Sequence, residues 1–309
     1  MSIKVSIIIV SWNTREILLS CLKSVFHETL NPFEVIVVDN ASNDNSADAV
    51  AAAYPDVNVI RNDENLGFAR ANNIGLKSAT GDFILFLNPD TIILDRAIDK
   101  MIAFMEKHPT IGVLGPHTLN ADGRTTQNTV IFIPTLKGVF HTHVPFWRFI
   151  PGWSPRLSGE VHWGKTGPVE IVKGSCMLIK KDLIHQLGGM NERHFMYSEE
   201  YDLCVRAAEF GYPVWYLDDA SIIHMGGQAT VQNSREMVYA MLDAYTDIFK
   251  RHNPNSSVRL FHLFLAIGSI WRWKVWVLMR LVPSKSTIAR VRMSEHQSSL
   301  RYLCFGSRS

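Results

Sequence analysis

An uninterrupted apolar run ends at a polar corner in Phe83-Ile84-Leu85-Phe86-Leu87-Asn88-Pro89-Asp90. Five apolar residues in a row after the turn pair Gly81-Asp82 predict a strand that is buried on both faces of a sheet. Open α/β sheets bind their ligands where the strands end, and Pro89 stiffens the corner that carries Asp90. Asp90 has two interpretations. It is a carboxylate for a divalent ion, since Mg²⁺ is typically held by one or two protein carboxylates, or it caps the next helix.

The first 115 residues alternate strand and helix patterns. Apolar runs predict strands, separated by stretches of helical periodicity, at residues 5–10, 35–38, 57–60, 83–87 and 111–114. This alternation predicts a mostly parallel sheet with helices on both faces. Later in the chain, residues 170–179 read as one strand, and residues 213–217 and 221–224 as two short ones.

Charge is distributed unevenly along the chain. The net charge is only +2, yet residues 251–309 contain ten Lys and Arg and a single acid, Glu295, whereas residues 1–250 contain 21 Lys and Arg and 28 Asp and Glu. A basic tail on an acidic body indicates an anionic partner surface, either membrane or nucleic acid. Because the tail is rich in Leu, Ile, Val and Trp, it favours lipid, and we expect no nucleic-acid partner.

The cysteines and the N-terminal residues indicate the cellular compartment in which the protein is expected. The four cysteines, Cys21, Cys176, Cys204 and Cys304, are scattered without a CxxC spacing. This pattern argues against a disulfide framework or a zinc site and fits a reducing compartment. The apolar run at residues 5–10 is too short for a signal peptide and reads as a first strand. We therefore expect a cytoplasmic protein.

Residues 258–283 form a strongly apolar segment with five aromatic residues. Its longest uncharged run has 12 residues, fewer than the roughly 20 that span a bilayer. Trp among Lys and Arg is typical of membrane interfaces, so we expect peripheral attachment to the inner face of the cell membrane. The alternative is a helix packed on the domain or in a homodimer.

Polar residues also follow the first two predicted strands. Ser11-Trp12-Asn13 ends the first strand and Asp39 ends the second, at what should be one edge of the sheet. The Asp39 carboxylate is suited to accept a hydrogen bond from a nucleobase N–H or a ribose hydroxyl. The alternative is that it caps the next helix. Residues 65–73 stand at a predicted helix N-terminus and contain several side-chain amides. Gly67 allows a close approach of the backbone and Arg70 supplies a positive charge. A helix N-terminus of this kind is suited to binding phosphate.

Three carboxylates, Glu199, Glu200 and Asp202, fall within four positions. Repulsion between neighbouring carboxylates raises at least one pKa toward the range of a general base. Arg206 lies four residues after Asp202 and can pair with it, which leaves Glu199 and Glu200 as the base candidates. The alternative is an acidic first turn favoured by the helix dipole.

His224 closes an apolar run just before Met225-Gly226-Gly227. A histidine at such a strand end binds metal or phosphate, or is a structural side chain. No GxGxxG follows a strand, which argues against a dehydrogenase. A sugar nucleotidyltransferase would require a Gly-rich basic loop after the first strand. The sequence has no such loop there, which argues against this class.

Taken in order, these motifs resemble the family-2 glycosyltransferases of GT-A fold and, within them, the bacterial dTDP-rhamnosyltransferase subgroup. The motifs are Ser11-Trp12-Asn13, residues 37–42, residues 65–73, Asn88-Pro89-Asp90, residues 199–206 and His224. The resemblance covers about residues 3–228. It implies a Rossmann-like, nucleotide-sugar-binding catalytic domain over residues 1–228. Residues 229–309 then form a helical extension, with the membrane-interface segment at about 258–283.

The resemblance also implies roles for individual residues. The base and ribose of a nucleotide-sugar would lie against Ser11, Trp12, Asn13 and Asp39, and the rest of the donor pocket would be lined by Asn65, Gly67, Arg70, Asn72 and Asn88. Asp90 would bind Mg²⁺ or Mn²⁺, with His224 as a second ligand or a diphosphate contact. Glu200 stands where the family has its catalytic base, although the usual Glu-Asp pair is Glu199-Glu200 here and the metal motif begins with Asn88 instead of Asp.

The expected protein is a metal-dependent inverting hexosyltransferase. It would move a sugar, with L-rhamnose from dTDP-rhamnose as the first choice and a UDP-sugar as the second, to a hydroxyl of a lipid-linked or polysaccharide acceptor. Such a reaction belongs to the synthesis of O-antigen or cell wall polysaccharide. The alternatives are a sugar nucleotidyltransferase and a non-catalytic protein of the same fold that binds membrane or nucleic acid through its basic tail.

Overall fold

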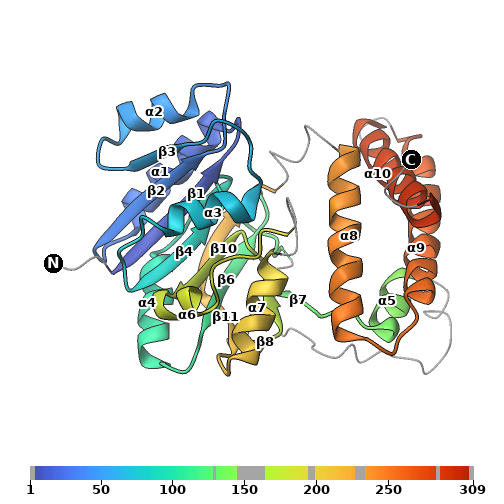
Figure 1. The fold of residues 1–309 in the computed structure, drawn as a ribbon. Coiled ribbons are helices and arrows are strands. Elements are labelled where there is room, and N and C mark those ends of the chain that lie inside the picture. The colour runs from blue at the N-terminus through green and yellow to red at the C-terminus, as the bar shows by residue number, and fades with distance from the viewer. Residues whose placement is uncertain are drawn as a thin grey trace. The chain divides into compact units, whose positions relative to one another are not determined.

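The computed structural model describes residues 4–127, 130–144, 164–193, 199–226, 234–282 and 286–305. The chain forms two compact units (Figure 1), residues 1–132 with 161–229 and residues 133–160 with 230–309. The sequence-based division after residue 228 differs from this one over residues 133–160. There, helix α5 (Leu136–His143) packs with the C-terminal helices, and its Phe140 ring lies 5.2 Å from that of Phe264.

A nine-stranded sheet forms the centre of the first unit. Its strands lie in the order β3 (Asn58–Arg61), β2 (Phe33–Asp39), β1 (Val5–Ser11), β4 (Phe83–Leu87), β10 (Cys176–Lys180), β6 (Val113–Leu119), β11 (Val214–His224) and β5 (Thr91–Ile93), and β8 (Gly167–Val169) pairs with β11. Strands β1 to β4 are parallel to one another, and β6 is parallel to β11. Strand β10 runs antiparallel between β4 and β6. The predicted mostly parallel sheet is confirmed.

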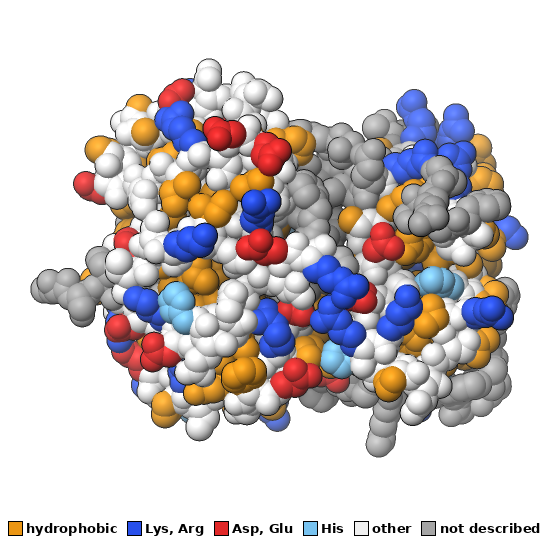
Figure 2. Space-filling view, viewed as in Figure 1, with side chains coloured by type: hydrophobic (Ala, Val, Ile, Leu, Met, Phe, Trp, Pro, Cys, Tyr) orange, Lys and Arg blue, Asp and Glu red, His pale blue; other side chains and the backbone are white. Residues whose placement is uncertain are grey.

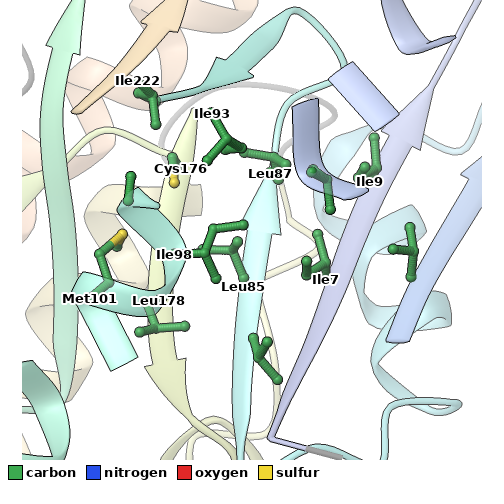
Figure 3. Packing of buried hydrophobic residues seen from close by; sticks show 14 of the residues in the cluster. Ile7, Ile9, Leu85, Leu87, Ile93, Ile98, Met101, Cys176, Leu178 and Ile222 are labelled. Atoms are coloured by element: carbon green, nitrogen blue, oxygen red, sulfur yellow. The ribbon is translucent and has the colours of Figure 1, made fainter. Parts of the chain in front are cut away.

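Helices cover both faces of this sheet. They are α1 (Arg15–Glu28), α2 (Ser46–Ala53), α3 (Phe68–Leu76), α4 (Ala97–Lys107), α6 (Lys181–Gln186) and α7 (Glu199–Glu209). On one face, Ile7 and Leu85 pack in a core with Ile98 of α4 (Figure 3). On the other face, α3 approaches so closely that a Cβ on Gly75 would lie 2.7 Å from Ile8 Cγ2.

Two predicted strand patterns fold differently. Residues 170–179 form two strands, β9 (Ile171–Val172) and β10, because β9 pairs with β7 (Val130–Ile131) in a small second sheet while β10 enters the large one. The chain changes sheets at residues 173–175. Residues 213–217 and 221–224 belong to one strand, β11, whose register shifts between Leu217 and Ser221.

The second unit is helical. Besides α5 it contains α8 (Ser234–His252), α9 (Val258–Met279) and α10 (Ser286–Phe305). Its core includes Phe249 and Phe261, whose rings stack with centroids 4.1 Å apart. Helix α9 begins at a conventional cap, where Ser257 Oγ accepts a hydrogen bond from Leu260 N. Among the helices of the described ranges, none is long and apolar enough to cross a bilayer.

Candidate active site

The corner after β4 holds Asp90 against His224. The Asp90 side chain is buried, and its Oδ1 lies 3.2 Å from His224 Nε2. The two meet because β5 pairs antiparallel with the end of β11, which places Thr91 opposite His224. Met225 N–H donates to the Asp90 carbonyl at 3.0 Å and fixes this junction from the other side.

Gln127 orients the His224 ring. Its Oε1 lies 2.8 Å from His224 Nδ1, and its Nε2 donates to the His224 carbonyl at 3.4 Å. An amide oxygen can only accept, so Nδ1 carries a hydrogen. Nε2 faces Asp90 Oδ1 and also lies 3.5 Å from Asn88 Nδ2. The corner therefore presents a ring nitrogen and a carboxylate oxygen side by side.

These donors fit a divalent ion that takes few ligands from the protein. Asp90 supplies an oxygen, His224 a nitrogen, and Asn88 Oδ1 is a buried acceptor with no hydrogen-bond partner in the described part of the chain. Two ligands bound at about 2.1 Å and at right angles lie about 3.0 Å apart, close to the observed spacing. The described ranges contain no cluster of three or more His, Cys, Asp or Glu, so substrate or water would complete the coordination.

Asp39 ends β2 in register with Ser11 at the end of β1. Its side chain is buried, and Oδ2 accepts from Ser42 N at 3.1 Å. Oδ1 is buried and has no hydrogen-bond partner among the residues that the structure describes. Buried acceptors without a partner are rare in folded proteins, so Asp39 Oδ1 and Asn88 Oδ1 are candidate ligand contacts. They lie at the ends of β2 and β4, which flank β1 in the sheet.

The Asn40 side chain connects several residues at this edge of the sheet, although the sequence analysis did not single it out. Its Nδ2 donates to Asn65 Oδ1 at 3.0 Å and to the Gly67 carbonyl at 3.2 Å, and its Oδ1 accepts from Asn62 Nδ2 at 2.8 Å. Gly67 has a φ of +82°, which favours glycine. Asn40 therefore holds the predicted donor residues Asn65 and Gly67 beside the end of β2.

The other predicted donor residues differ in their surroundings. Ser11 is buried with its Oγ 2.9 Å from Thr14 Oγ1, and Asn72 is buried with its Nδ2 donating back to the Phe68 carbonyl within α3. Asn13 Oδ1 accepts from Asn43 N at 2.7 Å. Trp12 is half-buried and Arg70 is exposed. Their roles in binding stay predictions.

Glu200 lies over the turn between β9 and β10. A Cβ placed on Gly174 would be 3.6 Å from Glu200 Cβ and 4.0 Å from its Oε2. Burial lowers the pKa of the neighbouring Lys173 ammonium, and the negative charge of Glu200 partly opposes that shift. Glu199 is buried, whereas Glu200 is half-buried. Glu200 is therefore the more accessible of the two base candidates.

Asp202 is part of a structural network. It accepts from Arg206 Nε at 2.5 Å and from Asn191 Nδ2 at 3.0 Å. The same guanidinium donates to the carbonyls of Leu187 and Gly189. Asp202 thus fastens α7 to the segment before it, and the role of Glu200 as the base stays a prediction.

One backbone hydrogen bond joins the Glu200 turn to the Asp90 corner. Asn88 N donates to the Ser175 carbonyl at 2.9 Å, so residues 173–175 connect the two groups directly. The Ser175 hydroxyl is itself buried with no hydrogen-bond partner among the described residues. Sequence reasoning missed Lys173, Ser175 and Gln127. Gly174, between the apolar pairs Ile171-Val172 and Cys176-Met177, was the available signal that the predicted strand is interrupted. Gln127 belongs to no motif.

Residues 6–187 match the family model of Glycosyl transferase family 2. The chain belongs to this family. It is 28% identical over 221 residues to the N-acetylglucosaminyl-diphospho-decaprenol L-rhamnosyltransferase of Mycobacterium tuberculosis, an alignment that covers 68% of this chain and 72% of that protein. It is 27% identical over 257 residues to a low-salt glycan biosynthesis hexosyltransferase of Haloferax volcanii, covering 82% and 76%.

Solved structures share the fold. A mannosyltransferase from Pyrobaculum calidifontis, in complex with GDP-Man and Mn²⁺, superimposes with a TM-score of 0.62 at 15% identity, covering 100% of this chain and 89% of that one. TarS 1–349 from S. aureus in complex with UDP gives 0.52 at 18% identity, covering 97% and 90%. The expected GT-A fold and the resemblance to bacterial rhamnosyltransferases are confirmed. The family match favours the transferase over the nucleotidyltransferase and the non-catalytic alternatives.

Proposed function

We propose that this protein is an inverting glycosyltransferase that uses a nucleotide diphosphate sugar. The observation that carries the proposal is the connection at one sheet edge. The Asp90–His224 pair, at 3.2 Å, is joined through Asn88 and Ser175 to the turn beneath Glu200. A single displacement requires a site that binds the sugar donor and a base held at a fixed position beside it. In this proposal the Asp90–His224 corner binds the donor and Glu200 is the base.

The reaction is one displacement at the anomeric carbon. The acceptor oxygen bonds to that carbon while the carbon–oxygen bond to the diphosphate breaks, and the nucleoside diphosphate leaves with the electron pair. Glu200 takes the proton of the acceptor hydroxyl. Lys173 lies close enough to Glu200 for the two charges to attract each other. Asp39 and the residues that Asn40 holds would bind the nucleoside.

Asp90 and His224, with Asn88 as a further oxygen donor, would hold Mg²⁺ or Mn²⁺. When bound, the ion would neutralise negative charge on the departing diphosphate. The presence of Mn²⁺ in the Pyrobaculum calidifontis mannosyltransferase complex supports this assignment.

The preferred substrates are dTDP-rhamnose as donor and a hydroxyl of a lipid-linked saccharide as acceptor, in cell-surface glycan synthesis. The Mycobacterium tuberculosis relative is named for L-rhamnose transfer to a decaprenol-linked sugar, which supports rhamnose as the sugar and a lipid-linked acceptor. A polysaccharide acceptor and a UDP-sugar donor are the second choices.

Helix α9 provides the proposed site of peripheral membrane attachment on the cytoplasmic leaflet. Its inner face packs in the helical core through Phe261 and Leu265. Six apolar side chains stand 40–67% exposed along the helix, namely Leu260, Leu263, Ile270, Trp271, Val275 and Leu278. Figure 2 shows Lys and Arg side chains beside hydrophobic ones on the helical unit. An apolar stripe flanked by cations matches an anionic lipid surface. We call these six residues the α9 stripe.

The first experiment identifies the donor. A panel of dTDP-, UDP- and GDP-sugars is scored for release of the nucleoside diphosphate, with and without a lipid-linked acceptor. We expect dTDP-rhamnose to give the highest kcat/KM. Release from none of the donors would overturn the proposal, and a clear preference for another sugar would correct the donor alone.

Asp90→Ala should abolish sugar transfer, because it removes the carboxylate that lies against His224 and is proposed to hold the ion. Mn²⁺ binding in the presence of a nucleoside diphosphate, followed by electron paramagnetic resonance, should disappear with it. Asp95→Ala is the matched control, since Asp95 is exposed and pairs with Lys100. Full activity of the wild-type protein in excess chelator would contradict the metal assignment.

Glu200→Gln should lower kcat by about 10²–10⁴-fold, the effect of a positioned general base, and leave donor affinity nearly unchanged. Glu199→Gln should have a much smaller effect on kcat. Asp202→Asn should mainly lower the free energy of unfolding, because it weakens the Arg206 network. If Glu199→Gln shows the large loss of kcat instead, the base is Glu199.

Leu263→Gln combined with Leu278→Gln should release the protein from vesicles of anionic lipid, because both changes place polar amides in the α9 stripe. Binding of the wild-type protein should also weaken with salt. Phe210→Gln changes an exposed aromatic residue of the first unit and serves as the control. Unchanged vesicle binding, together with a dimer that the double variant dissociates, would assign the stripe to a second copy of the chain.

A further inference from the structure

Arg272 lies on the inner side of α9 instead of on its exposed stripe. It follows Gly268 by one helical turn, and Gly268 packs so closely on α5 that a Cβ there would lie 2.7 Å from His143 Cβ. The guanidinium Nη2 is 2.6 Å from His143 Nδ1. Arg272 is half-buried, and burial lowers its pKa. Among the described residues, His143 is its only hydrogen-bond partner.

Among the residues that the structure describes, the groups around Arg272 do not neutralise its charge. Burial lowers the pKa of His143 to about 4, and the charge of Arg272 adds to the shift. Burial also lowers the pKa of His296, again with help from Arg272. Both rings are therefore neutral near pH 7. Glu295, the only acid after residue 250, has its Oε2 3.0 Å from Arg292 Nη1.

A half-buried cation with a single neutral partner is costly unless an anion binds it. A guanidinium has five N–H donors in a planar fork, and the one bond to His143 leaves most of them for a ligand. Phosphate matches that fork with two parallel hydrogen bonds. Trp271, the neighbouring residue, belongs to the α9 stripe and is 44% exposed, so an apolar chain can lie next to the phosphate.

We infer that Arg272, held by His143, binds the phosphate of a membrane lipid. The inference rests on the proposed function for the source of that phosphate, which is either a phospholipid headgroup or the diphosphate of a lipid-linked acceptor. Both present phosphate oxygens attached to an apolar tail. The site differs from the catalytic one, because its residues belong to the helical unit.

The experiment compares Arg272→Met with Arg259→Met in the full-length protein. Both variants remove one positive charge from α9, but Arg259 is exposed. Binding is measured by flotation on three kinds of vesicle: phosphatidylglycerol, phosphatidylcholine, and phosphatidylcholine with a few per cent undecaprenyl diphosphate. Arg259→Met should weaken binding to phosphatidylglycerol roughly fivefold, the effect of one surface charge.

Arg272→Met should weaken binding roughly 10- to 100-fold, since charge-assisted hydrogen bonds are lost as well. A loss on phosphatidylglycerol vesicles assigns the site to headgroup phosphate, and a loss confined to the vesicles with undecaprenyl diphosphate assigns it to the acceptor. A loss no larger than that of Arg259→Met on every vesicle would overturn the inference.

Stability gives a second readout. Arg272→Met should raise the thermal midpoint without lipid, because it removes an uncompensated cation from the helical unit. Arg272→Lys keeps the charge without the fork and should bind phosphate vesicles more weakly than the wild type, which keeps the test available if the Met variant fails to fold. Donor turnover by the wild-type protein, measured in the same preparation, shows separately whether the proposed glycosyltransferase activity holds.

Discussion

The hydrogen bond from Asn88 N–H to the Ser175 carbonyl, 2.9 Å long, is the contact on which the arrangement of the site depends. It continues the ladder in which β10 runs antiparallel along β4. A parallel strand in the place of β10 would enter the sheet from the opposite edge. Because β10 enters from the ligand-binding edge, the turn that precedes it lies beside the Asp90 corner and beneath Glu200. Two segments almost 90 residues apart are thereby held in one register.

The parallel half of the sheet could be predicted from the sequence, because it obeys local rules. The apolar run at residues 83–87 matches β4, and the run at 5–10 matches β1 to within one residue. Strands buried on both faces must be continuously apolar, so their positions are visible without knowledge of their partners. The placement of β10 between β4 and β6 was not visible, since strand order follows from long-range pairing and leaves no periodic trace.

The candidate site was predictable to the same degree. Asp39, Asp90 and His224 stand at strand ends, where polar residues interrupt apolar runs, and the sequence shows such interruptions directly. Gln127 and Lys173 act through partners that are distant in the chain, and nothing in their local sequence distinguishes them. Asn40 lies within the motif of residues 37–42, but its bonds to Asn62 and Asn65 follow only from the fold. The carboxylates of residues 199–202 were visible as a group, but only their contacts separate them. Asp202 bonds to Arg206, while Glu200 faces Gly174.

Helix α9 has an inner face that packs in the helical core and an outer face that is exposed, and each face contains residues that are unfavourable without a further partner. Its inner face must be apolar to pack with Phe249 and its neighbours, yet Arg272 interrupts that face and costs stability unless an anion compensates it. Its outer face keeps six apolar side chains in water, which also costs free energy unless they are covered. A lipid monolayer relieves both costs together, because its phosphates lie within a few ångströms of its acyl chains. A protein partner would have to supply an acidic group and an apolar surface at matched positions, so the two faces of α9 are more simply explained by a membrane than by a second protein.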